Sequence, residues 1–361
     1  MPLTVSRAAW PSSRFKPGIG LVEATAILAA VGCDSPSPVL EDRVETATPI
    51  ITTESARLSG PVDVAVDDSG LVYVLDYDRA EIQIVTPTGV SIRSIGRPGS
   101  GPGEFQRPVG FSVGDSVRVV DQGNGRLQTL TRRGQFVRSV VLPHFSNMGP
   151  VAVGRRGDFL VTTLGVDGVL AAAHDPSGAE VHRLGTPPVA SAPTLDPRRS
   201  KQDLVDGKLP AIFRNAVLPV MAPNGDRWLV LTGEGEFQRY SEAGVQLAAF
   251  PLTAPEMKQA LSEAVDHAKA TLDDPRTLRA LRYVLDATIV GNRLWVLLNS
   301  TRDGPAVLLA IEPDGTLGRR LTFSAVRGAR AFALDPIRGT AFFAAPEQAA
   351  LVAAPLPRGS F

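Results

Sequence analysis

The sequence contains a single cysteine, Cys33, among its 361 residues. One cysteine cannot form a disulfide within the chain or a cysteine-based metal cluster, so neither holds this fold together. Positive charge is not in excess, because 37 Lys and Arg residues balance 37 Asp and Glu residues. A chain without net positive charge has little to neutralise a phosphate backbone, and we do not expect a nucleic acid as a partner.

Motifs that carry chemistry are also missing. The sequence has no Gly-x-Ser-x-Gly nucleophile elbow, and the glycine-rich stretch 99–103 contains Pro102 and no lysine, so it is not a phosphate-binding loop. The four histidines show no metal-ligand spacing, and we expect exposed side chains without a role at His144, His174, His182 and His267. No cofactor is therefore predicted from these residues.

Long apolar runs are absent after residue 32, so no segment there offers the roughly 20 apolar residues of a membrane-spanning helix. The N-terminus differs. Residues 1–15 carry basic side chains and no acid, and an apolar run over 19–32 then leads directly to Cys33. This order is typical of an export signal. It resembles a bacterial lipoprotein signal peptide, in which the cysteine is lipidated and becomes the first residue of the mature protein.

The resemblance implies a signal peptide over residues 1–32, a lipidated Cys33, and a tether over 33–45 that is rich in Ser and Pro. The protein would then be exported to the cell envelope and anchored to a bacterial membrane, on its periplasmic or outer surface. The alternative is an ordinary cleaved signal peptide followed by an unmodified cysteine. Both interpretations predict export.

From residue 61 onward the chain repeats a unit of alternating apolar runs separated by tight turns. Asp76 and Asp121 are 45 residues apart, and so are Gly89 and Gly134. Runs of this length with a two-residue period, bounded by Gly, Pro and Asp, indicate strands of an antiparallel meander. Six units can be counted. A period in the forties with four strands per unit is typical of a β-propeller blade.

The sixth unit has only three clear strands. The β-branched segment 46–53, at the other end of the chain, is predicted to supply the fourth strand and close the ring. Its Pro49 removes one hydrogen-bond donor, which an outermost strand tolerates. Closure requires Ile50 and Ile51 to lie in a sheet, and it gives a propeller domain over residues 46–357.

The connection 96–108, with its Gly-Pro-Gly-Glu-Phe core, precedes a strand and then the run Val-Val-Asp-Gln-Gly-Asn-Gly-Arg-Leu-Gln at 119–128. This combination resembles the NHL repeat of six-bladed propellers, closely over 60–143 and more loosely over 151–357. The resemblance implies an all-β fold, a six-bladed β-propeller of four-stranded antiparallel blades around a central channel. Across that family the fold serves mostly in binding, and in a minority in lyase or hydrolase chemistry with metals at the channel.

Strand order divides the loops between two faces. If the strands of a blade are A to D, the A-to-B and C-to-D turns share one face, here the turn face. The B-to-C loops and D-to-A connections share the other, here the connection face. The connection face receives the connection 96–108, a loop insertion over 186–215 and a helical insertion over 253–282. Pro255 begins the predicted helix, and its apolar stripe should pack on the propeller: Met257, Leu261, Ala264, Val265, Ala268 and Leu272.

Long loops on a rigid scaffold are where binding usually occurs. We therefore expect a monomeric binding or scaffold module, rather than an enzyme, whose connection face takes a protein or a small envelope ligand. The hypothesised binding residues are Phe105, Arg107, Asp121, Asn124, Arg126, Asp76 and Arg79. For Asp76 and Asp121 the alternative is a purely structural cap, in which the carboxylate accepts backbone N–H groups of the following turn.

The alternative function is a metal-dependent hydrolase or lyase at the channel mouth, with Ca²⁺ as the candidate ion. Its weak candidate ligands are Asp121, Asn124, Glu234 and Asn299. Four or more carboxylate, amide or imidazole side chains meeting at the channel would favour the enzyme. A wide apolar mouth would favour binding.

Overall fold

The computed structural model describes residues 39–51, 58–142, 150–165, 168–190, 197–251, 254–271, 284–298, 304–348 and 350–361. The chain divides into Met1–Ser37 and a compact unit, Pro38–Phe361. The expected signal peptide and Cys33 lie outside the described residues. No helix in the described ranges has the length and hydropathy needed to cross a membrane.

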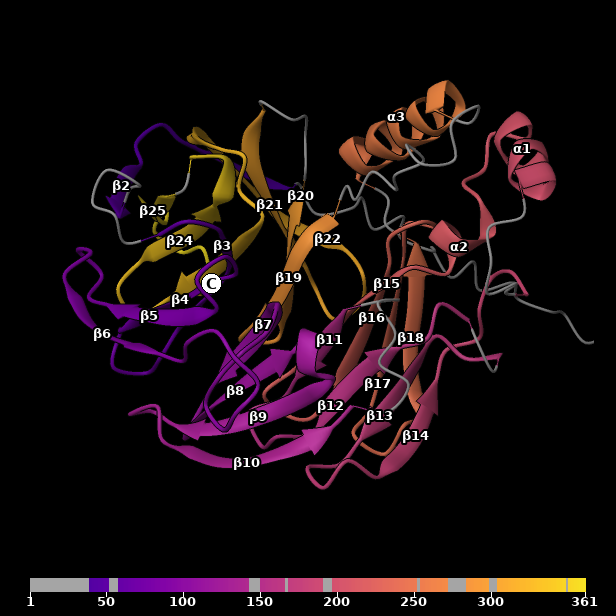
Figure 1. The fold of residues 1–361 in the computed structure, drawn as a ribbon. Helices are drawn as coiled ribbons and strands as arrows, with labels where there is room; N and C mark the ends of the chain where they lie inside the picture. Colours follow the sequence, from indigo (N-terminus) through magenta and orange to yellow (C-terminus); the bar gives the residue numbers. More distant parts are fainter. Residues whose placement is uncertain are drawn as a thin grey trace, which may run out of the picture. The chain divides into compact units, whose positions relative to one another are not determined.

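Six sheets make up the compact unit, each built on four antiparallel strands, which confirms the six-bladed β-propeller (Figure 1). From the innermost strand outward, blades 1 to 3 contain β3 (Pro61–Val66), β4 (Val72–Asp76), β5 (Glu81–Val85) and β6 (Ser91–Ile95); β7 (Pro108–Val113), β8 (Ser116–Asp121), β9 (Arg126–Thr131) and β10 (Phe136–Val141); and β11 (Val151–Val153), β12 (Phe159–Thr162), β13 (Ala171–His174) and β14 (Glu180–Leu184).

Blades 4 to 6 follow the same order. They contain β15 (Val217–Met221), β16 (Arg227–Leu231), β17 (Glu236–Tyr240) and β18 (Gln246–Pro251); β19 (Val284–Val290), β20 (Arg293–Leu298), β21 (Pro305–Ile311) and β22 (Leu317–Arg327); and β23 (Ala331–Asp335), β24 (Thr340–Ala345), β25 (Ala350–Pro355) and β2 (Thr48–Ile51). A fifth strand, β1 (Leu40–Val44), adds to the outer edge of blade 5.

The hydrophobic core lies between blades. Strand β4 is buried along its whole length, and its Tyr73 belongs to a cluster that joins Ile82 and Ile84 of blade 1 to Val117 and Val119 of blade 2. Each sheet thus covers a face of the next, which is why a single blade cannot bury its apolar side chains alone.

The tight turns follow the sequence pattern. In the first one, Gly70 adopts a φ of 87°, which glycine tolerates without a steric cost, and its N–H donates to the Asp67 carbonyl at 2.8 Å. The Asp67 carboxylate accepts the N–H groups of Ser69 and Leu71 at 2.9 and 3.0 Å. The turn is therefore closed by both the backbone and an aspartate side chain.

Ring closure by the N-terminal segment is confirmed. Strand β2 pairs antiparallel with β25 through Thr48↔Ala353, Pro49↔Val352 and Ile51↔Leu351. Pro49 sits in the outermost strand of blade 6, where its missing donor costs no ladder bond to a further strand.

The expected tether is corrected in its last part. Residues 40–44 form β1, which pairs in parallel with β22 from Leu40↔Arg319 to Val44↔Phe323. The Arg319 guanidinium donates to the Asp42 carboxylate at 2.9 and 2.5 Å and to the Gly359 carbonyl. A largely exposed, charged strand gives little periodic signal, so the sequence pattern did not reveal it. Residues 33–38 lie outside the described residues.

The insertion over 186–215 is also corrected, because it contains the helices α1 (Pro197–Val205) and α2 (Ala211–Arg214) rather than loop alone. The helix predicted in the other insertion is confirmed as α3 (Pro255–Thr271). Figure 1 shows α1, α2 and α3 on the same side of blades 4 and 5. Thr253, Leu272 and the second helix expected after residue 274 lie outside the described residues.

The apolar stripe of α3 is covered by two partners. Met257 packs with Trp228 and Val296 of blades 4 and 5, as the sequence predicted. Val265 packs instead with Leu204 of α1 and with Leu209, so the second half of the stripe is covered by the other insertion.

We expect Asp42→Ala to lower the free energy of unfolding by roughly 2 kcal/mol, because Arg319 is 8% exposed at its side chain and would lose its carboxylate partner. The matched control is Glu41→Ala, which removes an ion pair whose carboxylate is 62% exposed and should cost less than about 1 kcal/mol. Urea denaturation of both variants measures the difference. Equal losses would contradict the assigned role of Asp42.

Candidate ligand-binding channel

Asp121, the most prominent of the sequence-predicted site residues, is fully buried. Its carboxylate accepts four hydrogen bonds, from the Gln106 N–H at 2.7 Å, Asn124 Nδ2 at 2.8 Å, Arg126 Nε at 2.8 Å and Gln128 Nε2 at 3.1 Å. Its partners come from strand β9, from the loop before it and from the connection 96–108. Asp121 therefore fastens that connection to blade 2 and presents no surface to a ligand.

Asp76 has the same role one blade earlier. It is fully buried and accepts the N–H groups of Ser59, Gly60 and Arg79 at 2.7, 3.0 and 3.2 Å. The geometry thus favours the structural cap for both aspartates. Each carboxylate also binds backbone N–H groups of the segment that leads into the innermost strand.

Three further predicted residues hold the connection 96–108 in place. Phe105 is 1% exposed and packs against the core shared by blades 1 and 2. Asn124 donates to the Gly99 carbonyl at 3.0 Å, and Arg126 donates to the Gly101 carbonyl at 2.8 Å. These contacts explain the Gly-Pro-Gly-Glu-Phe pattern as an ordered connection.

Two of the predicted residues are exposed. Arg79 pairs with Glu81 at 2.7 Å. Arg107 lies just before β7 with a φ of 51°, a left-handed conformation that is uncommon for an arginine. A ligand role for this set stays a prediction, and any such ligand would meet Arg79 and Arg107 rather than the buried members.

The candidate metal ligands do not form one group. Asp121 and Asn124 belong to blade 2, whereas Glu234 follows the second strand of blade 4 and pairs with Arg214. Asn299 lies outside the described residues. Across the described ranges, no three His, Cys, Asp or Glu side chains are placed to hold a metal ion.

His174 corrects the expectation of exposed histidines. It is 2% exposed and stacks on Phe159 with ring centroids 4.8 Å apart. Burial lowers the pKa of its imidazole, so a neutral, packed side chain is expected. His144 lies outside the described residues.

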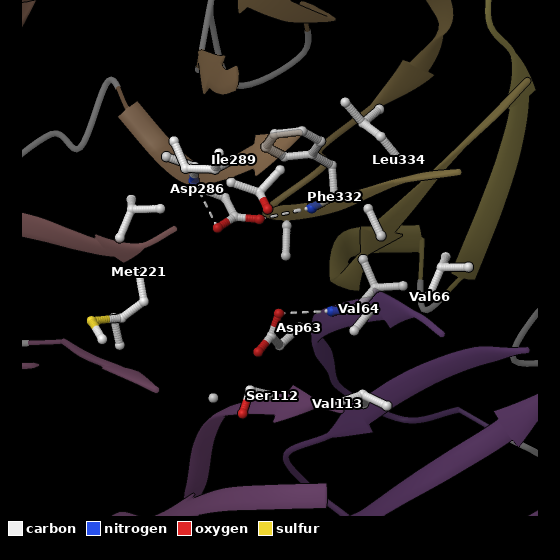
Figure 2. A pocket seen from close by; sticks show the side chains of 18 of the residues that line it. Asp63, Val64, Val66, Ser112, Val113, Met221, Asp286, Ile289, Phe332 and Leu334 are labelled. Carbon is white, nitrogen blue, oxygen red and sulfur yellow. Dashed lines mark hydrogen bonds between the residues drawn. The ribbon is translucent and has the colours of Figure 1, made fainter. Parts of the chain in front are cut away.

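A cavity of about 670 Å³ follows the central channel and is lined by the innermost strand of every blade. Its volume is within the range of roughly 300 to 1,000 Å³ typical of small-molecule sites. Figure 2 shows side chains from several blades around one space. Aliphatic side chains contribute to the wall, among them Val66, Val113, Val153, Met221, Ile289 and Leu334, together with polar and charged side chains.

Five aspartates line the cavity: Asp63, Asp67, Asp68, Asp286 and Asp335. Two of them lie inside an innermost strand rather than at its end or in the following turn. Asp63 on β3 and Asp286 on β19 both project into the cavity, as Figure 2 shows. Each follows a register shift in its strand, between Pro61 and Asp63 in blade 1 and between Val284 and Asp286 in blade 5. Such bulges change the direction of a side chain. The same bulge also occurs in blade 2, between Pro108 and Gly110, where a glycine stands in place of the aspartate.

The two carboxylates make equivalent hydrogen bonds. Asp63 accepts the N–H of Val64 at 2.8 Å and that of Phe111, in the next blade, at 3.1 Å. Asp286 accepts the N–H of Ala287 at 2.8 Å and that of Phe332, again in the next blade, at 2.9 Å. Each carboxylate thereby links the inner edges of two adjacent blades, where strand N–H groups otherwise lack a ladder partner.

No arginine or lysine of the described residues forms an ion pair with either carboxylate. Burial, followed by the charge of Asp286, raises the pKa of Asp63 well above its usual value, against the lowering effect of its two backbone hydrogen bonds. Burial raises the pKa of Asp286 to about 6. The channel therefore holds two carboxyl groups whose ionisation is opposed by their surroundings.

Sequence reasoning missed this pair. Asp63 occurs in Val-Asp-Val-Ala-Val, where it reads as an ordinary polar position of an alternating strand, and Asp286 occurs in Leu-Asp-Ala-Thr-Ile. The available signal was an aspartate at the same place in the first strand of two units. This signal could be interpreted only with the closed ring, because Asp63 and Asp286 are distant in sequence and come together only when blades 1, 5 and 6 are adjacent.

Comparison with known proteins supports the fold. A family model described as a 6-bladed beta-propeller (DUF5128) matches residues 44–151. No curated protein matches the chain.

Three solved structures are similar over most of their length. Regucalcin, a calcium-binding protein from Agrobacterium tumefaciens, is 8% identical over 88% of this chain and 95% of that chain, with a TM-score of 0.50. A gluconolactonase from Xanthomonas campestris is 10% identical over 86% and 89%, with a TM-score of 0.50. A DUF4221 family member from Bacteroides vulgatus is 8% identical over 86% and 96%, with a TM-score of 0.51. Identities this low show a shared fold alone.

We expect Asp121→Ala to lower the free energy of unfolding by about 3 to 5 kcal/mol, because it leaves the Arg126 guanidinium without its buried carboxylate. The control is Asp68→Ala, whose side chain is 81% exposed and which should change stability by less than about 0.5 kcal/mol. Chemical denaturation compares the two. Unchanged stability with loss of ligand binding would support a ligand role for Asp121 instead.

The channel carboxyls should make stability fall as pH rises. The unfolded state loses these protons near pH 4, whereas folded Asp286 keeps its proton up to about pH 6. Between these values the unfolded state binds fewer protons, so the free energy of unfolding decreases with pH. We expect Asp286→Asn to gain stability relative to the wild type between pH 4 and pH 7.

Denaturation curves at several pH values measure this relative gain, and any constant cost of the amide substitution cancels from the trend. Asp68→Asn, an exposed carboxylate of blade 1, serves as the control. Parallel pH profiles for the wild type and Asp286→Asn would contradict the raised pKa.

Proposed function

We propose that this protein is a binding module of the cell envelope whose ligand site is the central channel. The observation that carries the proposal is the pair of carboxyl groups, Asp63 and Asp286, which face a cavity of about 670 Å³ with aliphatic side chains on its wall. A concave apolar site with a few convergent polar groups and perturbed pKa values is the usual character of a small-molecule site.

The proposal moves the ligand site from the connection face to the channel. On the connection face, the predicted residues Asp76, Asp121 and Phe105 are buried and stabilise the loops around them. In the channel, the lining side chains surround open volume (Figure 2). A small envelope ligand therefore fits the geometry better at the channel.

A binding role is favoured over a metal-dependent hydrolase or lyase by the composition of the wall. Ca²⁺ takes about six to eight oxygen ligands in proteins. Among the described residues no three His, Cys, Asp or Glu side chains are placed to hold a metal ion. Asp63 and Asp286 each already accept two backbone N–H groups. The aliphatic side chains of the wall favour an organic ligand that is bound without being chemically changed.

The location forms part of the proposal. The basic segment, apolar run and Cys33 support export followed by lipid attachment. A protein held at the membrane by lipid would present its propeller to solutes of the envelope as a monomer.

Filling the channel should abolish ligand retention. We expect Val113→Trp, on the channel wall, to remove the small-molecule mass that accompanies the protein purified from its own envelope, as measured by native mass spectrometry. The matched control is Val141→Trp in the same blade, because Val141 is 79% exposed on the outermost strand. Retention of the same mass by both variants would argue against a channel site.

Loss of the cysteine should release the protein from membranes. We expect the full chain to partition into the detergent phase of Triton X-114, and Cys33→Ala to partition into the aqueous phase, because the acyl chains would be missing. Ser35→Ala is the control. If Cys33→Ala and the wild type partition alike, the lipid anchor is wrong, and an ordinary cleaved signal peptide becomes the better interpretation.

A further inference from the structure

We infer that the channel binds a primary ammonium group carried by an apolar body, with the ammonium held between Asp63 and Asp286. This inference rests on the proposed channel site and names the chemistry of its ligand. It follows from two features of the cavity: two carboxylates that face it and have no counter-ion among the described residues, and aliphatic side chains on the same wall.

The carboxylates supply the charge. Asp63 and Asp286 face the same cavity (Figure 2), and the charge of Asp286 acts on Asp63. Two negative charges that face one cavity oppose each other and favour a cation between them. Each carboxylate oxygen that accepts one backbone N–H has a further lone pair for a ligand donor.

Other ionisable side chains of the wall do not take this role. Most lie in the turns that follow the innermost strands, whereas Arg330 directly precedes β23. Several have partners of their own: Asp335 pairs with Arg338 at 2.9 Å, and Asp67 accepts from Tyr73 at 3.2 Å. The wall also includes Asp68, Arg155 and Arg330. The carboxylate pair is therefore open to a cation from outside the protein.

The number and type of acceptors select the cation. A primary ammonium has three N–H donors, and the two carboxylates have lone pairs left to accept them. A bare divalent ion would need several more oxygen ligands than these. The aliphatic side chains around the pair, such as Met221 and Ile289, contribute nothing to a metal ion but would bury the carbon skeleton of an amine.

The test uses the full chain at pH 8 and isothermal titration calorimetry with four probes. Hexylamine carries the ammonium on an apolar body, hexan-1-ol has the same body without charge, hexanoate reverses the charge, and CaCl₂ supplies a bare divalent ion. We expect hexylamine to bind at least about tenfold more tightly than hexan-1-ol, since a desolvated charge pair adds more than 1.4 kcal/mol. Hexanoate and calcium should not compete.

The variants Asp286→Asn and Asp63→Asn should each weaken hexylamine binding by roughly 30-fold, because one carboxylate of the pair is lost. Each amide keeps an oxygen that can accept a backbone N–H, and circular dichroism confirms that the variants fold. Asp266→Asn, whose carboxylate is 72% exposed on α3 and does not line the cavity, should bind hexylamine like the wild type.

Several results would overturn the inference. Equal affinity for hexylamine and hexan-1-ol would mean that only the apolar wall binds, which leaves the proposed channel site intact. Calcium binding that depends on Asp63 and Asp286, without hexylamine binding, would assign the pair to an inorganic ion. Hexylamine binding that survives Val113→Trp would place the amine elsewhere. If no probe binds, the ammonium inference fails. The proposed function is then still tested by native mass spectrometry, which shows whether Val113→Trp loses the small-molecule mass.

Discussion

Each blade of this protein needs a neighbour on both sides, because its two middle strands are apolar on both faces. Strand β4 is buried along all of its residues, and so is β16 in blade 4. The clusters that bury them cross from one blade to the next, as Tyr73 of blade 1 does with Val117 of blade 2. A row of such sheets is stable only when its ends meet, so the whole domain depends on the pairing of β2 with β25.

The repeated pattern explains why the fold could be predicted from sequence. Tight turns such as Asp67–Gly70 recur at fixed places in successive units, and the alternating runs between them leave little choice of strand. The closing strand was predictable because the sixth unit lacked one. Strand β1 was not, because Leu40–Val44 buries only Val44 and gains its stability from a partner strand 277 residues away.

The candidate site was harder to predict, for a reason that lies in the ring. Asp76 and Asp121 stand out in the sequence because they end a strand and begin a polar loop, but that position suits an aspartate that binds backbone N–H groups. Asp63 and Asp286 look ordinary within their strands. Their chemistry comes from convergence on the channel axis and from the loss of water around them, and a local pattern contains neither.

The two N-terminal strands also have a consequence for folding order. Strands β1 and β2 leave the translocation machinery or the ribosome first, yet their partners β22 and β25 are made last. Throughout synthesis these first strands have unpaired edges, and blades 1 to 4 must assemble without them. Contacts of such high sequence separation form slowly and leave intermediates prone to aggregation. The charged side chains of β1, among them Glu41 and Asp42, would oppose aggregation through this unpaired strand edge until blade 5 has been synthesised.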